Sequence, residues 1–134
     1  MTGNQILIIE DNPMNLELAT DLLEANGFVV TSAQTAEEGL RLARERLPDL
    51  VLMDFSLPGM DGLTATRNLK ANPATSQLAV VGLTANAMKG DEELALKAGC
   101  DGYLTKPIDT RTFVATVKNF IAAASLRQSN KTTP

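Results

Sequence analysis

The 134-residue sequence contains no histidine, a single cysteine and no long apolar run. The lack of histidine excludes general base catalysis by histidine, Ser-His-Asp and Cys-His nucleophilic centres, and most zinc sites. One cysteine, Cys100, cannot form an internal disulfide, which agrees with a reducing compartment. Any chemistry must therefore use carboxylates, hydroxyls, lysine or a hard metal ion.

Membrane insertion, export and nucleic-acid binding are also disfavoured. No stretch of about 18 apolar residues is present to span a bilayer. The first residues, Met1–Asn4, lack the charged and apolar regions of a signal peptide, so we expect a cytoplasmic protein without a membrane partner. The net charge is −4 and no basic block occurs. Because phosphate contacts need clustered lysine or arginine, we expect no direct nucleic-acid partner.

Short apolar runs recur along the chain and predict a parallel sheet. Ile6–Ile9, Leu50–Met53 and Ala79–Leu83 are apolar on both sides, which is typical of strands covered on both faces. Phe28–Val30 and Gly102–Leu104 are expected to form two further strands at the edges.

Five helical patterns lie between and after these runs. The first is expected from Asn12 to Asn26-Gly27, the third from Asp61-Gly62 to Asn72-Pro73 and the fourth from about Ala87 to Ala98. The second begins with a capping box at Thr35 and has Leu40, Ala43 and Leu47 on one face. The fifth begins at Asp109 and has an apolar face formed by Phe113, Val117, Phe120, Ile121 and Ala124. The alternation predicts a doubly wound α/β domain with a five-stranded parallel sheet. We expect the domain to cover residues 1–124 and a polar, frayed tail to cover 125–134.

Polar residues directly follow four of the apolar runs. They are Glu10-Asp11, Asp54, Thr84 and the segment that reaches Lys106. In a doubly wound sheet, ligands bind outside the carboxyl ends of the strands. We therefore expect these residues to converge at one edge of the sheet.

Three carboxylates at one edge repel one another, and a cation or protonation must relieve the repulsion. Because only oxygen ligands are offered, the expected ion is Mg2+. Asp54 is the best candidate nucleophile, since it ends the central strand and carboxylates are established phosphoryl acceptors. Glu10 and Asp11 lie at a helix start and suit metal ligation.

The charge balance of this edge predicts further roles. With Glu10, Asp11 and Asp54 ionised, Mg2+ and Lys106 neutralise the site. An acyl phosphate on Asp54 leaves about one excess negative charge, which needs hydrogen-bond donors. The hydroxyl of Thr84 and the backbone N–H of Ala85 are placed to supply them.

Each of these residues also has a structural explanation. Acidic groups are favoured at a helix N-terminus by the dipole alone, and an aspartate after a strand is often a turn former. Thr84 suits a cap, Lys106 a surface turn, and Tyr103 a packed edge position. Their coincidence at the ends of successive strands favours a functional site.

Taken together, the chain resembles the receiver domains of two-component response regulators over roughly Gln5 to Ile121. The motifs that carry the resemblance are Ile8-Ile9-Glu10-Asp11-Asn12, Leu52-Met53-Asp54, Leu57-Pro58-Gly59-Met60-Asp61-Gly62, Leu83-Thr84-Ala85 and Lys106-Pro107, in this order and at the family's spacing. The resemblance implies a flavodoxin-like fold with strand order 2-1-3-4-5. The stretch Thr84–Glu93 is most similar to single-domain regulators of the DivK type and to receivers of hybrid kinases.

The resemblance also implies roles for the site residues. Asp54 is expected to accept a phosphoryl group from a histidine on a separate kinase or phosphotransfer protein. Asp11 is expected to bind Mg2+ directly, Glu10 largely through water, and the backbone carbonyl of Ser56 to add a ligand. Lys106 is expected to contact the phosphoryl group, with a cis bond to Pro107.

Switching is expected to follow phosphorylation. Thr84 then moves toward the phosphate and Tyr103 swings inward, which reshapes the surface formed by helix 87–98, strand 102–104 and the helix that starts at 109. Partner proteins read that surface. We expect a monomer or weak dimer and, because only 13 residues follow Ile121, no attached effector domain.

Two positions depart from the family pattern. Glu10 replaces the more usual aspartate, a change that preserves a carboxylate ligand. Gly82 lies inside the expected strand 79–83, where a side chain normally packs, and the sequence gives no reason for it.

Other functions remain open at this level. A phosphatase of the haloacid dehalogenase type also uses an aspartyl phosphate, but it needs a second aspartate at the position of Ser56. A flavodoxin-like FMN carrier needs free N–H groups where Glu10 and Asp11 would repel the phosphate. Within the family, the alternatives are a receiver excised from a hybrid kinase and an inactive receiver used for docking.

Overall fold

The computed structural model describes residues 4–57, 59–84 and 89–132, and in these ranges five strands alternate with five helices. The strands are β1 (Gln5–Ile9), β2 (Val29–Ala33), β3 (Leu50–Asp54), β4 (Ala79–Thr84) and β5 (Gly102–Thr105); the helices are α1 (Pro13–Glu24), α2 (Ala36–Arg46), α3 (Gly62–Ala71), α4 (Lys89–Ala98) and α5 (Phe113–Thr132). All strand pairs are parallel, in the order β2-β1-β3-β4-β5. The predicted doubly wound fold and strand order are confirmed.

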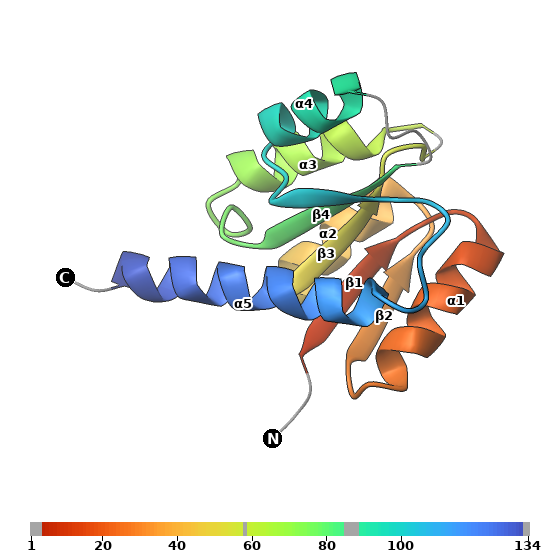
Figure 1. Cartoon of the computed structure of the whole chain (residues 1–134). Coiled ribbons are helices and arrows are strands. Elements are labelled where there is room, and N and C mark those ends of the chain that lie inside the picture. Colours follow the sequence, from red (N-terminus) through yellow and green to blue (C-terminus); the bar gives the residue numbers. More distant parts are fainter. Residues whose placement is uncertain (1–3, 58, 85–88, 133–134) are drawn as a thin grey trace.

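Helices cover both faces of the sheet, as Figure 1 shows. Alternate strand residues point to opposite faces, so each central strand contributes to two cores. Leu7, Met53 and Val80 belong to the core under α2, α3 and α4. Ile8 and Leu52 belong to the core under α1 and α5. This double burial explains why the central strands are apolar up to their carboxyl ends.

Three helix starts have the caps that the sequence predicts. The side-chain oxygens of Asn12, Thr35 and Asp61 accept hydrogen bonds from backbone N–H groups two or three residues onward, at 2.9, 3.2 and 2.8 Å. Each bond satisfies a donor that the first turn of a helix leaves free. The caps of α1 and α3 matter most here, because Asn12 directly follows Asp11, and Gly62, which follows Asp61, lies against the backbone of Asp54.

The expected second helix face is wrong at Leu47. This residue ends α2 in the left-handed conformation, with φ of 46°, and 54% of its surface is exposed. Pro48 explains the difference, because the residue before a proline is disfavoured in the helical conformation. The second strand also differs: it begins at Val29, not Phe28, and continues to Ala33.

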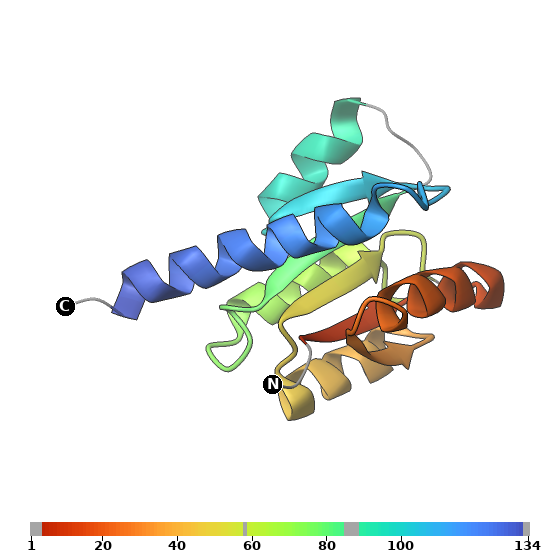
Figure 2. The ribbon, with the colours of Figure 1, turned by 60° about the horizontal axis from the view of Figure 1, so that its bottom comes forward.

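The C-terminal helix differs from expectation at both ends. A turn around Asp109 precedes it, and α5 begins at Phe113 and continues to Thr132 (Figure 2). Residues 125–132 are therefore helical, where the sequence predicted a frayed tail. This segment contains no proline or glycine, and Leu126, Arg127 and Gln128 are good helix formers. No helix among the described residues is both long and apolar enough to cross a membrane.

Candidate phosphoacceptor site

The carboxyl ends of four strands supply the candidate site. Asp54 is the last residue of β3 and Thr84 is the last residue of β4. Glu10 directly follows β1, and its N–H donates to the carbonyl of Ala33 at 3.0 Å. Lys106 directly follows β5, and its N–H donates to the carbonyl of Thr84 at 2.8 Å. Backbone pairing thus fixes the starting point of each side chain.

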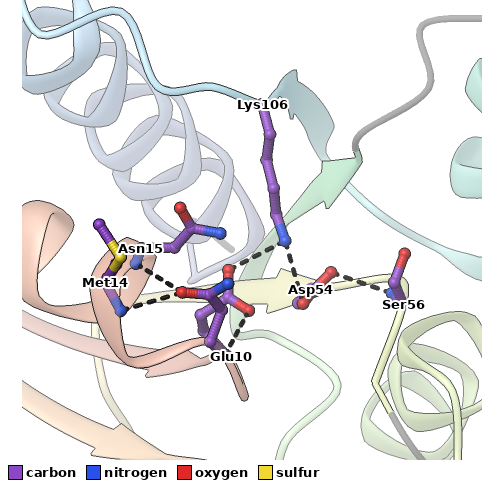
Figure 3. A network of polar contacts seen from close by, with 7 residues as sticks. Glu10, Met14, Asn15, Asp54, Ser56 and Lys106 are labelled. Atoms are coloured by element: carbon purple, nitrogen blue, oxygen red, sulfur yellow. Dashed lines mark hydrogen bonds and ion pairs between the residues drawn. The ribbon is translucent and has the colours of Figure 1, made fainter.

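Lys106 joins two carboxylates at the centre of this edge. Its Nζ lies 2.9 Å from Oε1 of Glu10 and 3.0 Å from Oδ2 of Asp54 (Figure 3). The side chain of Lys106 is 15% exposed, and the side chains of Glu10 and Asp54 are each only 2% exposed. In this weakly solvated position one ammonium partly compensates two negative charges, and the contacts raise the pKa of Lys106 although burial alone lowers it.

Of the two buried carboxyl groups, that of Glu10 is the harder to ionise. Burial raises the pKa of Glu10, and the nearby Asp54 raises it further, against the opposing effects of Lys106 and the backbone N–H of Asn12. That N–H donates to Oε2 at 3.2 Å. Oε1 contacts Lys106 as an ion pair without hydrogen-bond geometry. The buried oxygen therefore has capacity for a further electrostatic partner.

Asp54 ionises more readily than Glu10. Burial acts to raise its pKa, but the interactions with Glu10, the backbone N–H of Ser56 and Lys106 outweigh burial and lower the pKa overall. The N–H of Ser56 donates to Oδ1 at 2.9 Å, so both carboxylate oxygens have partners (Figure 3). An ionised, oriented carboxylate at a strand end is suited to act as a nucleophile.

A third carboxylate completes an acidic cluster. One oxygen from each of Glu10, Asp11 and Asp54 lies within 4.8 Å of the other two. Asp11 is exposed, so the cluster opens to solvent on its side. Three carboxylates, one of which has a buried oxygen without a hydrogen bond, fit a hard divalent cation such as Mg2+. They are the carboxylates that the sequence predicted for this purpose.

Two of the remaining predicted residues, Thr84 and Tyr103, lie in β4 and β5. Thr84 is buried at the end of β4, opposite Thr105 in the strand register. Tyr103 is half-buried in β5, and the Lys106–Pro107 bond is cis, as expected. Ala85 lies outside the described residues.

The sequence did not identify Phe55, Gly62 and Gly82 as parts of this region. A Cβ built on Gly62 would overlap the carbonyl of Asp54, and one built on Gly82 would overlap the ring of Phe55. Both glycines therefore permit close approach to the segment that carries the candidate nucleophile. The unexplained glycine inside the fourth strand was the available signal, because a glycine there often marks such an approach.

Comparison with known proteins agrees with this geometry. Residues 6–118 match the family model of the response regulator receiver domain. The chain is 42% identical over 119 residues to the polar-differentiation response regulator DivK of Brucella ovis. The alignment covers 89% of this chain and 97% of that protein.

Two solved structures show the same fold. A CheY-like response regulator receiver domain protein from Methanospirillum hungatei JF-1 aligns with a TM-score of 0.86 and 26% identity, over 94% of this chain and 99% of the other. The second is the receiver domain of a sensor histidine kinase from Pseudomonas aeruginosa PAO1, which has a magnesium ion coordinated in its active site cleft. It aligns with a TM-score of 0.83 and 35% identity, over 90% of this chain and 99% of the other. The chain therefore belongs to the response regulator receiver domains of two-component systems and is similar to DivK.

Proposed function

We propose that this chain accepts a phosphoryl group on Asp54 from a phosphohistidine of a sensor histidine kinase or histidine phosphotransfer protein. A carboxylate oxygen of Asp54 forms the new bond to phosphorus, the phosphorus–nitrogen bond breaks, and the imidazole leaves with its electron pair. The observation that supports this most directly is the pairing of buried Asp54 with Lys106 inside the acidic cluster. The chain would signal through this modification, as receiver domains do.

Mg2+ would be held by Glu10, Asp11, Asp54 and the backbone carbonyl of Ser56. When bound, it would supply positive charge that offsets the repulsion between the carboxylates and the incoming phosphoryl oxygens. The carboxylate cluster and the buried oxygen of Glu10 support this ligand set. The side chain of Ser56 is exposed, and its backbone is already tied to Asp54 by a hydrogen bond.

Lys106, Thr84 and Ala85 would bind the phosphorylated product. In the proposed transfer, the ammonium of Lys106 leaves its contact with Glu10 and follows the charge that accumulates on the phosphoryl oxygens. The hydroxyl of Thr84 and the backbone N–H of Ala85 add hydrogen bonds to those oxygens. These donors match the excess negative charge that an acyl phosphate brings.

The signal would leave through the α4–β5–α5 surface. Thr84 moves toward the phosphate and Tyr103 turns inward, so the phosphate biases an equilibrium between two arrangements of this surface. The register supports a connection, because Thr84 pairs with Thr105 and Tyr103 pairs with Gly82 across β4 and β5. A downstream protein would bind this surface.

A receiver within a hybrid kinase is a second candidate, supported by the 35% identity to the receiver of the Pseudomonas aeruginosa sensor histidine kinase. The phosphoacceptor chemistry is the same in both cases. Length of the native gene product distinguishes them, because a hybrid kinase carries its transmitter domains on the same polypeptide.

Incubation with acetyl phosphate and Mg2+, followed by intact-protein mass spectrometry, tests the proposal. We expect one phosphoryl addition to the wild type, none to Asp54→Asn, and none to the wild type after chelation of the metal. Addition to Asp54→Asn at the wild-type rate would count against Asp54 as the acceptor.

A further inference from the structure

The segment Asp54–Phe55 is packed between two glycines from different elements. On one side, a Cβ on Gly62 at the start of α3 would overlap the carbonyl of Asp54 and lie 2.9 Å from Cα of Phe55. On the other side, a Cβ on Gly82 in β4 would lie 2.5 and 2.7 Å from two ring carbons of Phe55. Neither position has room for a side chain, so backbone and ring occupy that space.

The ring of Phe55 therefore has a seat formed by the bare backbone of β4. The nearest atoms to the missing Cβ of Gly82 all belong to this ring. Phe55 is half-buried and packs against the core under α2, α3 and α4. Its own N–H donates to the carbonyl of Leu83 at 3.0 Å. Backbone and side chain thus hold Phe55 to the same strand.

Phe55 lies between the two residues on which the proposed chemistry depends. Asp54 precedes it, and Ser56, whose N–H donates to Oδ1 of Asp54 at 2.9 Å, follows it. Because adjacent residues share peptide planes, fixing the Cα of Phe55 restricts both neighbours. Gly82 is also two residues before Thr84, so the two positions lie on the same face of β4.

We propose that Phe55, seated on Gly82, is a positioning residue for phosphoryl transfer. Its ring anchors the turn after β3, and this anchor holds the Asp54 carboxylate and the backbone of Ser56 in their mutual geometry. The inference rests on the proposed function of Asp54. The seat also explains a glycine in the interior of a buried strand, where the lost side chain otherwise weakens packing.

Two single variants and their combination test this seat. Phe55→Ala removes the ring, and Gly82→Ala fills the seat and displaces the ring. We expect each to slow phosphorylation by acetyl phosphate by roughly tenfold or more, because small displacements of reacting groups have large effects on rate. Phe55→Ala/Gly82→Ala should be no slower than Phe55→Ala, since the added methyl then has no ring to displace.

A matched pair elsewhere in the sheet separates positioning from general packing. A Cβ on Gly102 in β5 would lie 2.5 Å from Cζ of Phe120 in α5, so this glycine also faces an aromatic ring. Gly102 is at the end of β5 remote from Lys106. Gly102→Ala and Phe120→Ala should lower the unfolding temperature while slowing phosphorylation less than the Phe55 and Gly82 variants do.

Hydrogen exchange of the Ser56 amide, measured by NMR without metal or phosphodonor, gives a readout independent of the proposed function. We expect about tenfold faster exchange in Phe55→Ala and Gly82→Ala at a temperature where the control pair leaves it unchanged. Phe55→Leu, which keeps an apolar side chain, serves if Phe55→Ala does not fold, with the same expected direction. Wild-type exchange and phosphorylation rates in the Phe55 and Gly82 variants would overturn the inference.

The outcomes for the two proposals are distinct. If the wild type is not phosphorylated, the proposed function fails, and the Ser56 exchange still decides whether Phe55 positions the turn. If the wild type is phosphorylated and the control pair slows the reaction as much as the Phe55 and Gly82 variants do, the positioning role is rejected and the proposed function stands.

Discussion

The carboxyl groups of Glu10 and Asp54 contact the same ammonium, yet their pKa values move in opposite directions. The pKa of Glu10 is raised above 4.5, chiefly by burial and then by Asp54. For Asp54, burial is outweighed by the interactions with Glu10, the Ser56 backbone and Lys106, and the pKa falls below 3.8. When the metal-free site takes up a proton, Glu10 therefore receives it before Asp54 does. Asp54 remains ionised in this protonation state.

The first prediction concerns how the stability of the metal-free protein depends on pH. Because the folded pKa of Glu10 is raised, its contribution is fully present below the unfolded value of 4.5 and is lost as the pH rises through the folded pKa. Glu10→Gln cannot ionise, so the variant should lack this loss. Urea unfolding at a series of pH values, with a chelator present, measures the difference.

Asp54 should show the reverse dependence, because its folded pKa is lowered. Its contribution is present above the unfolded value of 3.8 and is lost as the pH falls through the folded pKa. NMR titration of the side-chain carboxyl carbons can resolve the two groups. Asp54→Asn should also lower the pKa of Glu10, because Asp54 supplies two of the causes that raise it. An unchanged pKa of Glu10 in this variant would contradict the coupling.

The second prediction is that Mg2+ stabilises the folded chain through the acidic cluster. A ligand at 100 times its Kd stabilises the state that binds it by about 2.7 kcal/mol. We expect the unfolding temperature of the wild type to rise with Mg2+ concentration, and the rise to be lost in Asp11→Asn. Asp21 is an exposed residue of α1 away from the cluster, so Asp21→Asn is the matched control and should respond as the wild type does. An equal response of the Asp11 and Asp21 variants would remove Asp11 from the ligand set.

The sequence was sufficient to predict that Glu10, Asp11, Asp54 and Lys106 meet, for a topological reason. In parallel strands with helical crossovers, every carboxyl end lies at the same edge, so a polar residue after each apolar run is placed there. The ends of Ile6–Ile9 and Leu50–Met53 could be located because polarity changes abruptly at Glu10 and Asp54. Ion-pair distances and opposite pKa shifts could not be predicted, because they depend on side-chain geometry.

Features that depend on a long-range contact or on one backbone angle were missed. The periodicity of 36–46 continues to Leu47, but Pro48 changes the backbone preference of Leu47 and the helix ends. Gly82 stands out within its own strand, but the reason for it is visible only when the ring of Phe55 is placed against it. Local patterns identify a face of an element and leave its particular contacts undetermined.

The third prediction uses the left-handed conformation of Leu47. A side chain at this angle carries a steric penalty that glycine does not, and more than half of Leu47 is exposed. Leu47→Gly should therefore stabilise the chain by roughly 0.5–1 kcal/mol, after the greater freedom of glycine in the unfolded state is included. Leu47→Ala keeps the penalty and should give no gain. Equal stability of the two variants in urea unfolding would show that the backbone angle carries no penalty.

The fourth prediction concerns Lys106, whose ammonium offsets two buried carboxylates. Lys106→Met keeps much of the side-chain volume but leaves Glu10 and Asp54 without their cation. Removing one member of a buried charge cluster commonly costs about 3–5 kcal/mol, so the metal-free variant should be less stable than the wild type by an amount of this order.

Mg2+ should restore part of the stability that Lys106→Met loses, because it returns positive charge to the same carboxylates. The rise in unfolding temperature with Mg2+ should therefore be larger in Lys106→Met than in the wild type. Lys97→Met, which alters an exposed lysine of α4, should change neither the metal-free stability nor the response by a comparable amount. A Lys106 variant that matched the wild type without metal would show that the two carboxylates do not need the ammonium, and the electrostatic basis of the site would have to be sought in protonation of Glu10 instead.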